Sequence, residues 1–136
     1  MKNLSFGGYG ISDSNERVQF PHFINPTKEI IDEIVSKTVE YNQGLIGISI
    51  NPEPDIGIFQ LTVEYDSGNY LPLLGIYLND GDTDIKNWIE PKNKGKNIDI
   101  GGYFYPFEFT TQNLQIIKNL LITFIEDSDL LINIMK

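Results

Sequence analysis

Three aspartates at alternate positions are the first candidates for chemistry in this chain. Asp80, Asp82 and Asp84 have the i, i+2, i+4 spacing of the first ligands in a calcium-binding loop, where carboxylate oxygens hold the cation. The remainder of that loop is missing, because Ile85 stands where it needs a glycine and Pro91 where it needs a bidentate glutamate. We expect a solvated acidic turn with no metal centre, and a weak non-standard cation site is the alternative.

Other residues used in catalysis or cofactor binding form no familiar pattern. The chain has no cysteine, and the sequence places no triad partner for its single histidine, His22. The glycines at positions 7, 8 and 10 lack the following lysine of a phosphate-binding loop, and no serine lies in a Gly-x-Ser-x-Gly turn. We therefore expect no catalytic residue and no cofactor.

Acidic charge is concentrated in the middle of the chain. The 136 residues carry a net charge of −9, and the segment 45–91 holds eight carboxylates against one lysine. Such a surface repels the phosphates of nucleic acids and of anionic membranes, so it favours a basic protein partner. We predict that this partner is bound by six carboxylates and one anchoring tryptophan: Glu53, Asp55, Asp80, Asp82, Asp84, Trp88 and Glu90.

Length and hydropathy predict an ordinary globular protein. A chain of 136 residues is expected to form a single domain, residues 1–136. The first residues contain no apolar core of a signal peptide, and no apolar run approaches the roughly 20 residues of a membrane span. We expect a cytoplasmic location. The sequence indicates no oligomeric state.

These features together resemble a known class of proteins. Small size, the lack of catalytic and cofactor motifs, and the acidic segment Glu53–Glu90 resemble, in general character, the immunity proteins of bacterial contact-dependent and polymorphic toxin systems. The resemblance implies a non-enzymatic inhibitor that covers a basic toxin. A nuclease is the expected toxin, because nuclease sites are cationic in order to hold phosphates.

Two other functions stay open at this stage. The chain could be a small-molecule or carbohydrate-binding module that uses Trp88 and the aromatic run Tyr103–Phe109, although aromatics leading into a helix are more often core. It could also be a hydrolase that uses a pair of carboxylates, whose separation is a spatial quantity that a sequence does not reveal.

The elements that position these residues are predicted to form an α+β fold. Residues 57–65 alternate between apolar and polar side chains, and a polar turn at 66–69 leads into the apolar segment 70–78, which indicates a central antiparallel hairpin. Strands at Leu45–Ile50 and Ile98–Tyr103 are expected in the same sheet, giving about four to five strands.

Two amphipathic helices are predicted to cover that sheet. One begins at Pro26 with Asn25 as its N-cap, and the other follows a cap at Thr110 or Thr111. Residues 1–24 show no clean period, because residues 6–10 are too rich in glycine for the interior of a regular strand, although residues 20–23 fit a short extended piece. Residues 85–89 fit a helical turn or a short edge strand, and residues 130–135 fit a strand or a short helix.

Overall fold

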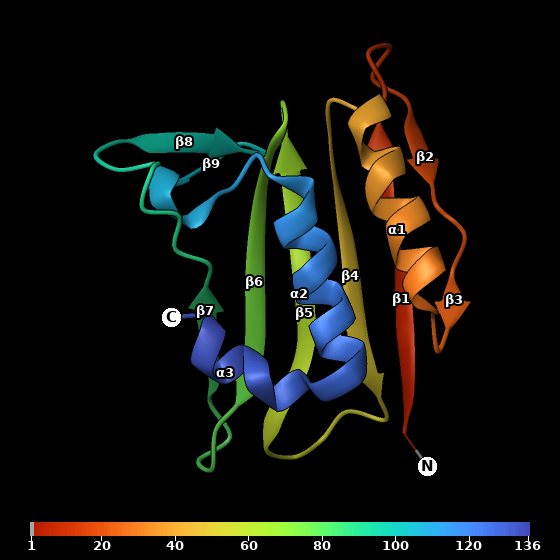
Figure 1. The fold of residues 1–136 in the computed structure, drawn as a ribbon, viewed down its shortest axis with the longest axis vertical. Coiled ribbons are helices and arrows are strands. Elements are labelled where there is room, and N and C mark those ends of the chain that lie inside the picture. Colours follow the sequence, from red (N-terminus) through yellow and green to blue (C-terminus); the bar gives the residue numbers. More distant parts are fainter. Residues whose placement is uncertain (1) are drawn as a thin grey trace.

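One antiparallel sheet with two helices on one face dominates the structure, a computed structural model that describes residues 2–136 (Figure 1). The predicted α+β class is confirmed, but the sheet has seven strands rather than four to five. Its order is β2-β1-β4-β5-β6-β7, with β3 also paired to β1. The strands are β1 (Asn3–Ile11), β2 (Arg17–Gln19), β3 (Phe23–Ile24), β4 (Gln43–Asn51), β5 (Gly57–Asp66), β6 (Asn69–Tyr77) and β7 (Thr83–Asn87).

The predicted central hairpin is β5 and β6. Leu61, Val63 and Tyr65 of β5 are buried, while the residues between them face the other side of the sheet and are half-buried. Pro72 of β6 has no N–H to donate, so it is tolerated only at an edge or a bulge of the sheet. β7 pairs with residues 73–77 of β6 and does not reach Pro72. Pro72 therefore has a neighbouring strand on the β5 side only.

The glycine-rich start of the chain is a nine-residue strand, so the expectation of an irregular segment was wrong. Gly10 of β1 and Gly44 of the neighbouring strand β4 are needed where aromatic rings lie against the sheet. A Cβ atom on Gly10 would lie 2.4 Å from the ring of Tyr41, and one on Gly44 would lie 2.4 Å from the hydroxyl of Tyr65. Glycine here provides space for the aromatic core rather than a turn.

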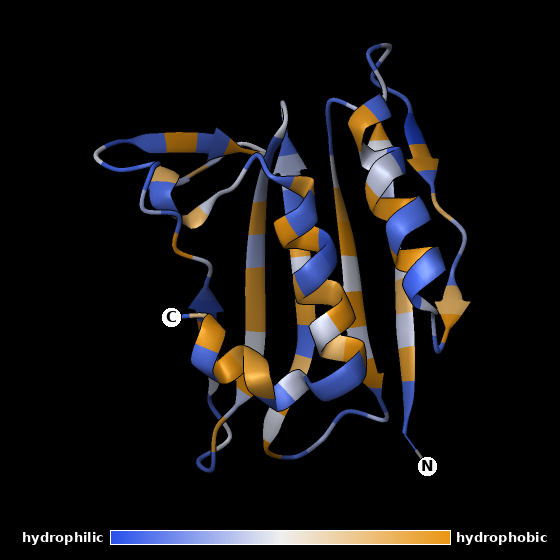
Figure 2. Ribbon diagram, viewed as in Figure 1, coloured by the Kyte–Doolittle hydropathy of each residue, from blue (hydrophilic) through white to orange (hydrophobic). Residues whose placement is uncertain are grey.

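Helices α1 (Lys28–Lys37) and α2 (Leu114–Asp127) pack on one face of the sheet, and hydrophobic residues recur along both (Figure 2). Both begin later than predicted. The side chain of Thr27 caps α1 and that of Asn113 caps α2. Asn25, the expected cap of the first helix, takes a positive φ of 51° instead. The core between the layers includes Ile31, Ile34, Val35, Ile46, Ile48, Leu61, Val63, Leu74, Ile117, Leu121 and Phe124.

The prediction that residues 98–103 join the main sheet was wrong. Strands β8 (Asn97–Ile100) and β9 (Tyr103–Pro106) form a separate two-stranded hairpin at one end of the molecule (Figure 1). A hydrogen bond of 3.1 Å from the Gly101 N–H to the Asp66 carboxylate holds this hairpin to the end of β5. We call the sheet face opposite the helices the open face.

The remaining elements close one edge of the sheet. Residues 83–87 form the edge strand β7, one of the two structures that the sequence allowed. The structure also has three 3-10 turns, η1 (Thr38–Glu40), η2 (Phe107–Phe109) and η3 (Ser128–Leu130). The short helix α3 (Leu131–Ile134) follows η3 near the end of the chain. Lys136 then exchanges two backbone hydrogen bonds with Asn87, which pairs the free side of β7. Within residues 2–136, no helix has both the length and the hydropathy to cross a membrane.

Candidate functional site

Five of the seven predicted contact residues lie at one end of the sheet. Glu53 and Asp55 belong to the loop between β4 and β5, Asp80 and Asp82 to the loop between β6 and β7, and Asp84 to the start of β7. These loops lie at the same end of the sheet (Figure 1). Tyr77, the last residue of β6, pairs with the first residue of β5 on one side and with the first residue of β7 on the other. We call these five residues the acidic end.

The carboxylates of the acidic end are exposed and form no ion pair with the basic side chains of residues 2–136. All five side chains are exposed, and the ion pairs found in residues 2–136, Lys28–Glu126 and Lys118–Asp32, do not involve them. The Tyr77 hydroxyl donates a hydrogen bond of 3.0 Å to Glu53 Oε2, which links the two loops. Their negative charge is therefore left to solvent or to a partner.

Apolar side chains are exposed beside these carboxylates. Ile56, Leu78 and Ile85 are 59%, 41% and 46% exposed, and each lies in or next to the loops of the acidic end. Phe59 and Tyr77 stack at the same end with their ring centroids 4.0 Å apart. A protein-binding surface typically has apolar residues at its centre and polar residues at its rim.

Trp88 and Glu90 lie apart from the acidic end. The five residues of β7 extend about 17 Å at about 3.3 Å per residue, so residues beyond Asn87 are carried toward the other end of the sheet. Trp88 packs against the hydrophobic core, and its Nε1 atom is buried with no hydrogen-bond acceptor in the described structure. Glu90 accepts a long hydrogen bond of 3.5 Å from the Thr111 hydroxyl.

The three aspartates with calcium-like spacing do not gather around a common point. Asp80 accepts a hydrogen bond of 3.0 Å from the backbone N–H of Asp82, which closes the turn locally. No group of three or more His, Cys, Asp or Glu side chains placed to hold a metal ion occurs in the described residues.

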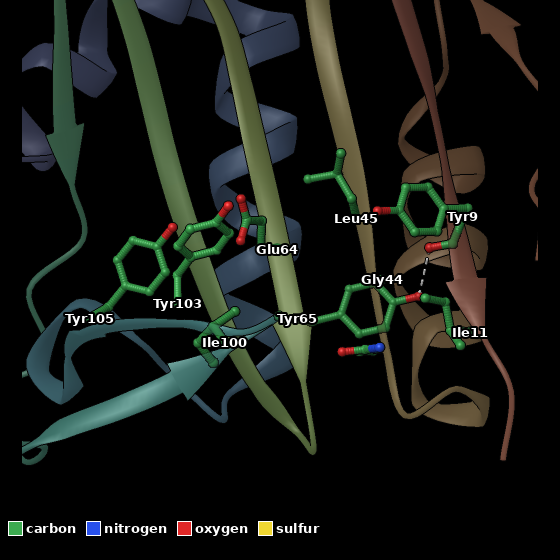
Figure 3. A pocket seen from close by; sticks show the side chains of 11 residues that line it. Tyr9, Ile11, Gly44, Leu45, Glu64, Tyr65, Ile100, Tyr103 and Tyr105 are labelled. Carbon is green, nitrogen blue, oxygen red and sulfur yellow. Dashed lines mark hydrogen bonds between the residues drawn. The ribbon is translucent and has the colours of Figure 1, made fainter. Parts of the chain in front are cut away.

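A second feature, which sequence reasoning missed, is a cavity of about 370 Å³ on the open face under the β8–β9 hairpin (Figure 3). Glu64 of β5 points into it. Tyr103 and Tyr105 of β9 lie on one side of that carboxylate, and Tyr9 of β1 lies with Leu45 on the other. We call the cavity bounded by Tyr9, Glu64, Tyr103 and Tyr105 the tyrosine cleft.

Burial dominates the electrostatics of the tyrosine cleft. It raises the pKa of Glu64 above its ordinary value, since the charged form loses water. It also raises the pKa of Tyr105, and the negative charge of Glu64 adds to that effect. Below the cleft, the Tyr65 hydroxyl donates a hydrogen bond of 3.0 Å to the carbonyl of Tyr9.

The family model described as "Family of unknown function (DUF6911)" matches residues 3–134. The chain belongs to this family. The crystal structure of a hypothetical protein from Neisseria gonorrhoeae is similar to it, with a TM-score of 0.82 and 33% sequence identity over 93% of this chain and 88% of that chain. No curated protein matches the chain.

Within this DUF6911 chain, part of the tyrosine cleft could have been found from the sequence. The alternation along β5 places Glu64 on the face opposite Val63 and Tyr65, so a glutamate on the open face was predictable. Its tyrosine neighbours were not, because Tyr103 and Tyr105 reach Glu64 only through the separate β8–β9 hairpin.

Proposed function

We propose that this chain is a non-enzymatic immunity protein that binds and neutralises a basic toxin, expected to be a nuclease, in the cytoplasm. The acidic end supplies the contact surface. The observation that carries the proposal is the set of five exposed carboxylates, which form no ion pair within residues 2–136, interspersed with the exposed side chains of Ile56, Leu78 and Ile85.

The electrostatics of the acidic end favour rapid association with a cationic protein. Like charges on one surface repel each other, and a cationic partner relieves that repulsion while attracting the surface from a distance. Exposed apolar side chains add area that is removed from water in the complex. A nuclease site is cationic because it holds phosphates, so an acidic surface of this kind fits over it.

Neither Trp88 nor Glu90 belongs to the proposed contact surface. Trp88 contributes to the core, and Glu90 contacts Thr111 away from the acidic end. The proposed contacts are therefore Glu53, Asp55 and the three aspartates of residues 80–84.

The alternative of a carbohydrate-binding module has one observation in its favour. Tyr103 and Phe104 are 71% and 74% exposed, against the expectation that this aromatic run is mostly core. However, they are consecutive residues of β9, and consecutive strand side chains point to opposite faces. The two rings therefore do not form one stacking platform for a sugar.

The alternative of a carboxylate-dependent hydrolase has less support. Its mechanism needs two carboxyl groups about 5 to 9 Å apart across the scissile bond. Glu64 is the one acidic residue among those that line the tyrosine cleft. The inhibitor proposal needs no such pair and is preferred.

Growth rescue tests the proposal. The product of the neighbouring gene is expressed in a bacterial host as the candidate toxin, together with this chain. We expect the wild-type chain to restore growth, and the triple variant Asp80→Lys/Asp82→Lys/Asp84→Lys to fail. The matched control Asp13→Lys/Glu16→Lys/Glu40→Lys changes three exposed carboxylates at the opposite end of the sheet and keeps the rescue.

Two results would count against the proposal. Rescue by the first triple variant at wild-type efficiency would remove the acidic end as the contact surface. A wild-type chain that neither restores growth nor binds the candidate toxin would contradict the immunity function with that partner.

A further inference from the structure

We infer that the tyrosine cleft is a binding site for a guanidinium group, which the basic partner supplies as an arginine side chain. This inference deepens the proposed function and rests on it. It concerns Tyr9, Glu64, Tyr103 and Tyr105, which are distinct from the acidic end.

The carboxylate of Glu64 lacks a partner of opposite charge. It is half-buried, and within the structure described it makes neither an ion pair nor a hydrogen bond. Its cross-strand neighbours are apolar, with Leu45 beside it on β4 and Leu71 beside it on β6. Removing a carboxylate from water without a partner is unfavourable, so a cation entering the cleft would restore the lost interaction.

The tyrosines of the cleft favour a cation that has a flat shape. Aromatic ring faces attract cations, and guanidinium also stacks on them and pairs with a carboxylate through two parallel hydrogen bonds. Tyr9 already makes such a contact, since the guanidinium carbon of Arg17 lies 3.9 Å from its ring centroid. Arg17 does not fill the tyrosine cleft, because it lines a neighbouring cavity on the open face.

The walls of the cleft suit the remainder of an arginine side chain. Ile11, Leu45 and Ile100 provide apolar surface around the single carboxylate. The aliphatic stem of arginine packs on such surface while its charged group reaches a polar partner. A volume of about 370 Å³ leaves room for the whole side chain.

One partner can reach both the tyrosine cleft and the acidic end. The loop that carries Glu53 and Asp55 ends at Gly57, the first residue of β5. Seven residue steps separate Gly57 from Glu64 along the strand, which is about 23 Å at about 3.3 Å per step. An ordinary interface covers about 800 Å² on each protein, a patch about 28 Å across. The partner would therefore lie along the open face, where Gln60 and Thr62 separate the two sites.

An NMR titration tests the site without the partner. The probe is N-acetyl-L-arginine amide, and the neutral control is the citrulline analogue, which has nearly the same shape. We expect the arginine probe to shift the amide signals of residues 9, 64, 103 and 105 and the citrulline probe to leave them in place. Glu64→Gln should weaken the arginine probe about tenfold, whereas Glu53→Gln at the acidic end should have no effect.

Two results of the titration would overturn the site. Equal shifts with the arginine and citrulline probes would show that charge is not recognised. Unchanged affinity in Glu64→Gln would show that Glu64 is not the group that pairs with the probe. Overlay of the remaining amide signals with those of the wild type confirms that each variant is folded.

Binding to the candidate toxin separates this inference from the proposed function. Reduced affinity in both Glu64→Gln and the Asp80/Asp82/Asp84 triple variant supports both. If only the triple variant is weakened, the partner does not use the cleft and the inference fails while the function stands. If the arginine probe binds but the toxin does not, the guanidinium site stands. The proposed function and the claim that this toxin supplies the arginine are then both contradicted.

Discussion

The hydroxyl of Tyr77 donates a hydrogen bond to Oε2 of Glu53 at 3.0 Å, which connects the end of β6 to the loop between β4 and β5. The ring of the same tyrosine stacks on Phe59, which the bulge in β5 places on the open face. Tyr77 therefore joins the two loops of the acidic end and fixes the position of one of its carboxylates.

Replacing Tyr77 by phenylalanine should loosen this connection without disturbing the stack. We expect faster hydrogen exchange at the amides of residues 53–56 in Tyr77→Phe, because the loop loses its tie to β6. The core does not depend on this contact, so the melting temperature should stay close to that of the wild type. Exchange at wild-type rates would show that the loop is held by other contacts.

The glycines of β4 should differ sharply in their tolerance of a methyl group. A Cβ atom on Gly44 would lie 2.2 Å from the carbonyl oxygen of Tyr9, whereas one on Gly47 would have its nearest contact at 3.4 Å. We expect Gly44→Ala to lower the free energy of unfolding by about 1–3 kcal/mol through overpacking. Gly47→Ala, in the same strand, should stay within about 1 kcal/mol of the wild type. Equal losses in denaturant unfolding would contradict this explanation.

The sequence reveals the α+β class because the alternation along β5 and the apolar stripes of both helices are strong periodic signals. It hides β1, since a glycine that makes room for Tyr41 looks like a loop residue when its partner in the fold is unknown. The sequence also wrongly suggests that Trp88 lies beside the aspartates of residues 80–84. These residues are close in sequence, but the length of β7 separates Trp88 from the acidic end in the fold. The tyrosine cleft depends on long-range packing of the β8–β9 hairpin, which no local pattern records.

A buried pair of hydroxyl groups joins α1 to the sheet. The Thr38 and Tyr70 hydroxyls lie 2.7 Å apart, and Thr38 also donates to the carbonyl of Val35. Thr38→Val should cost about 1–3 kcal/mol, because it leaves the Tyr70 hydroxyl buried without a partner. The double variant Thr38→Val/Tyr70→Phe should recover most of that loss in chemical unfolding. Additive losses would show that the two hydroxyl groups do not interact.

The half-buried carboxylate of Glu64 should reduce stability at neutral pH. Burial raises its pKa in the folded state, so the unfolded chain releases this proton at a lower pH. Stability is then lost as the pH rises from the ordinary pKa through the raised one. We expect Glu64→Gln to melt at a higher temperature than the wild type at pH 7 and at an equal temperature below pH 4.

Glu40 provides the control for that comparison, because its side chain is exposed. Glu40→Gln should leave the melting temperature nearly unchanged across the same pH range. If Glu64→Gln is less stable than the wild type at pH 7, the carboxylate has a favourable partner in the folded protein, which would contradict the vacant cleft inferred above.

The most direct test of the central claim is the rate at which the chain associates with its candidate toxin as salt is varied. Stopped-flow measurements with wild-type protein should show an association rate that falls steeply with ionic strength. The Asp80→Lys/Asp82→Lys/Asp84→Lys variant should associate about tenfold more slowly or worse at low salt and lose most of that salt dependence. The Asp13→Lys/Glu16→Lys/Glu40→Lys control should retain most of the wild-type rate. Equal rates and equal salt dependence for the two triple variants would contradict a basic partner bound at the acidic end.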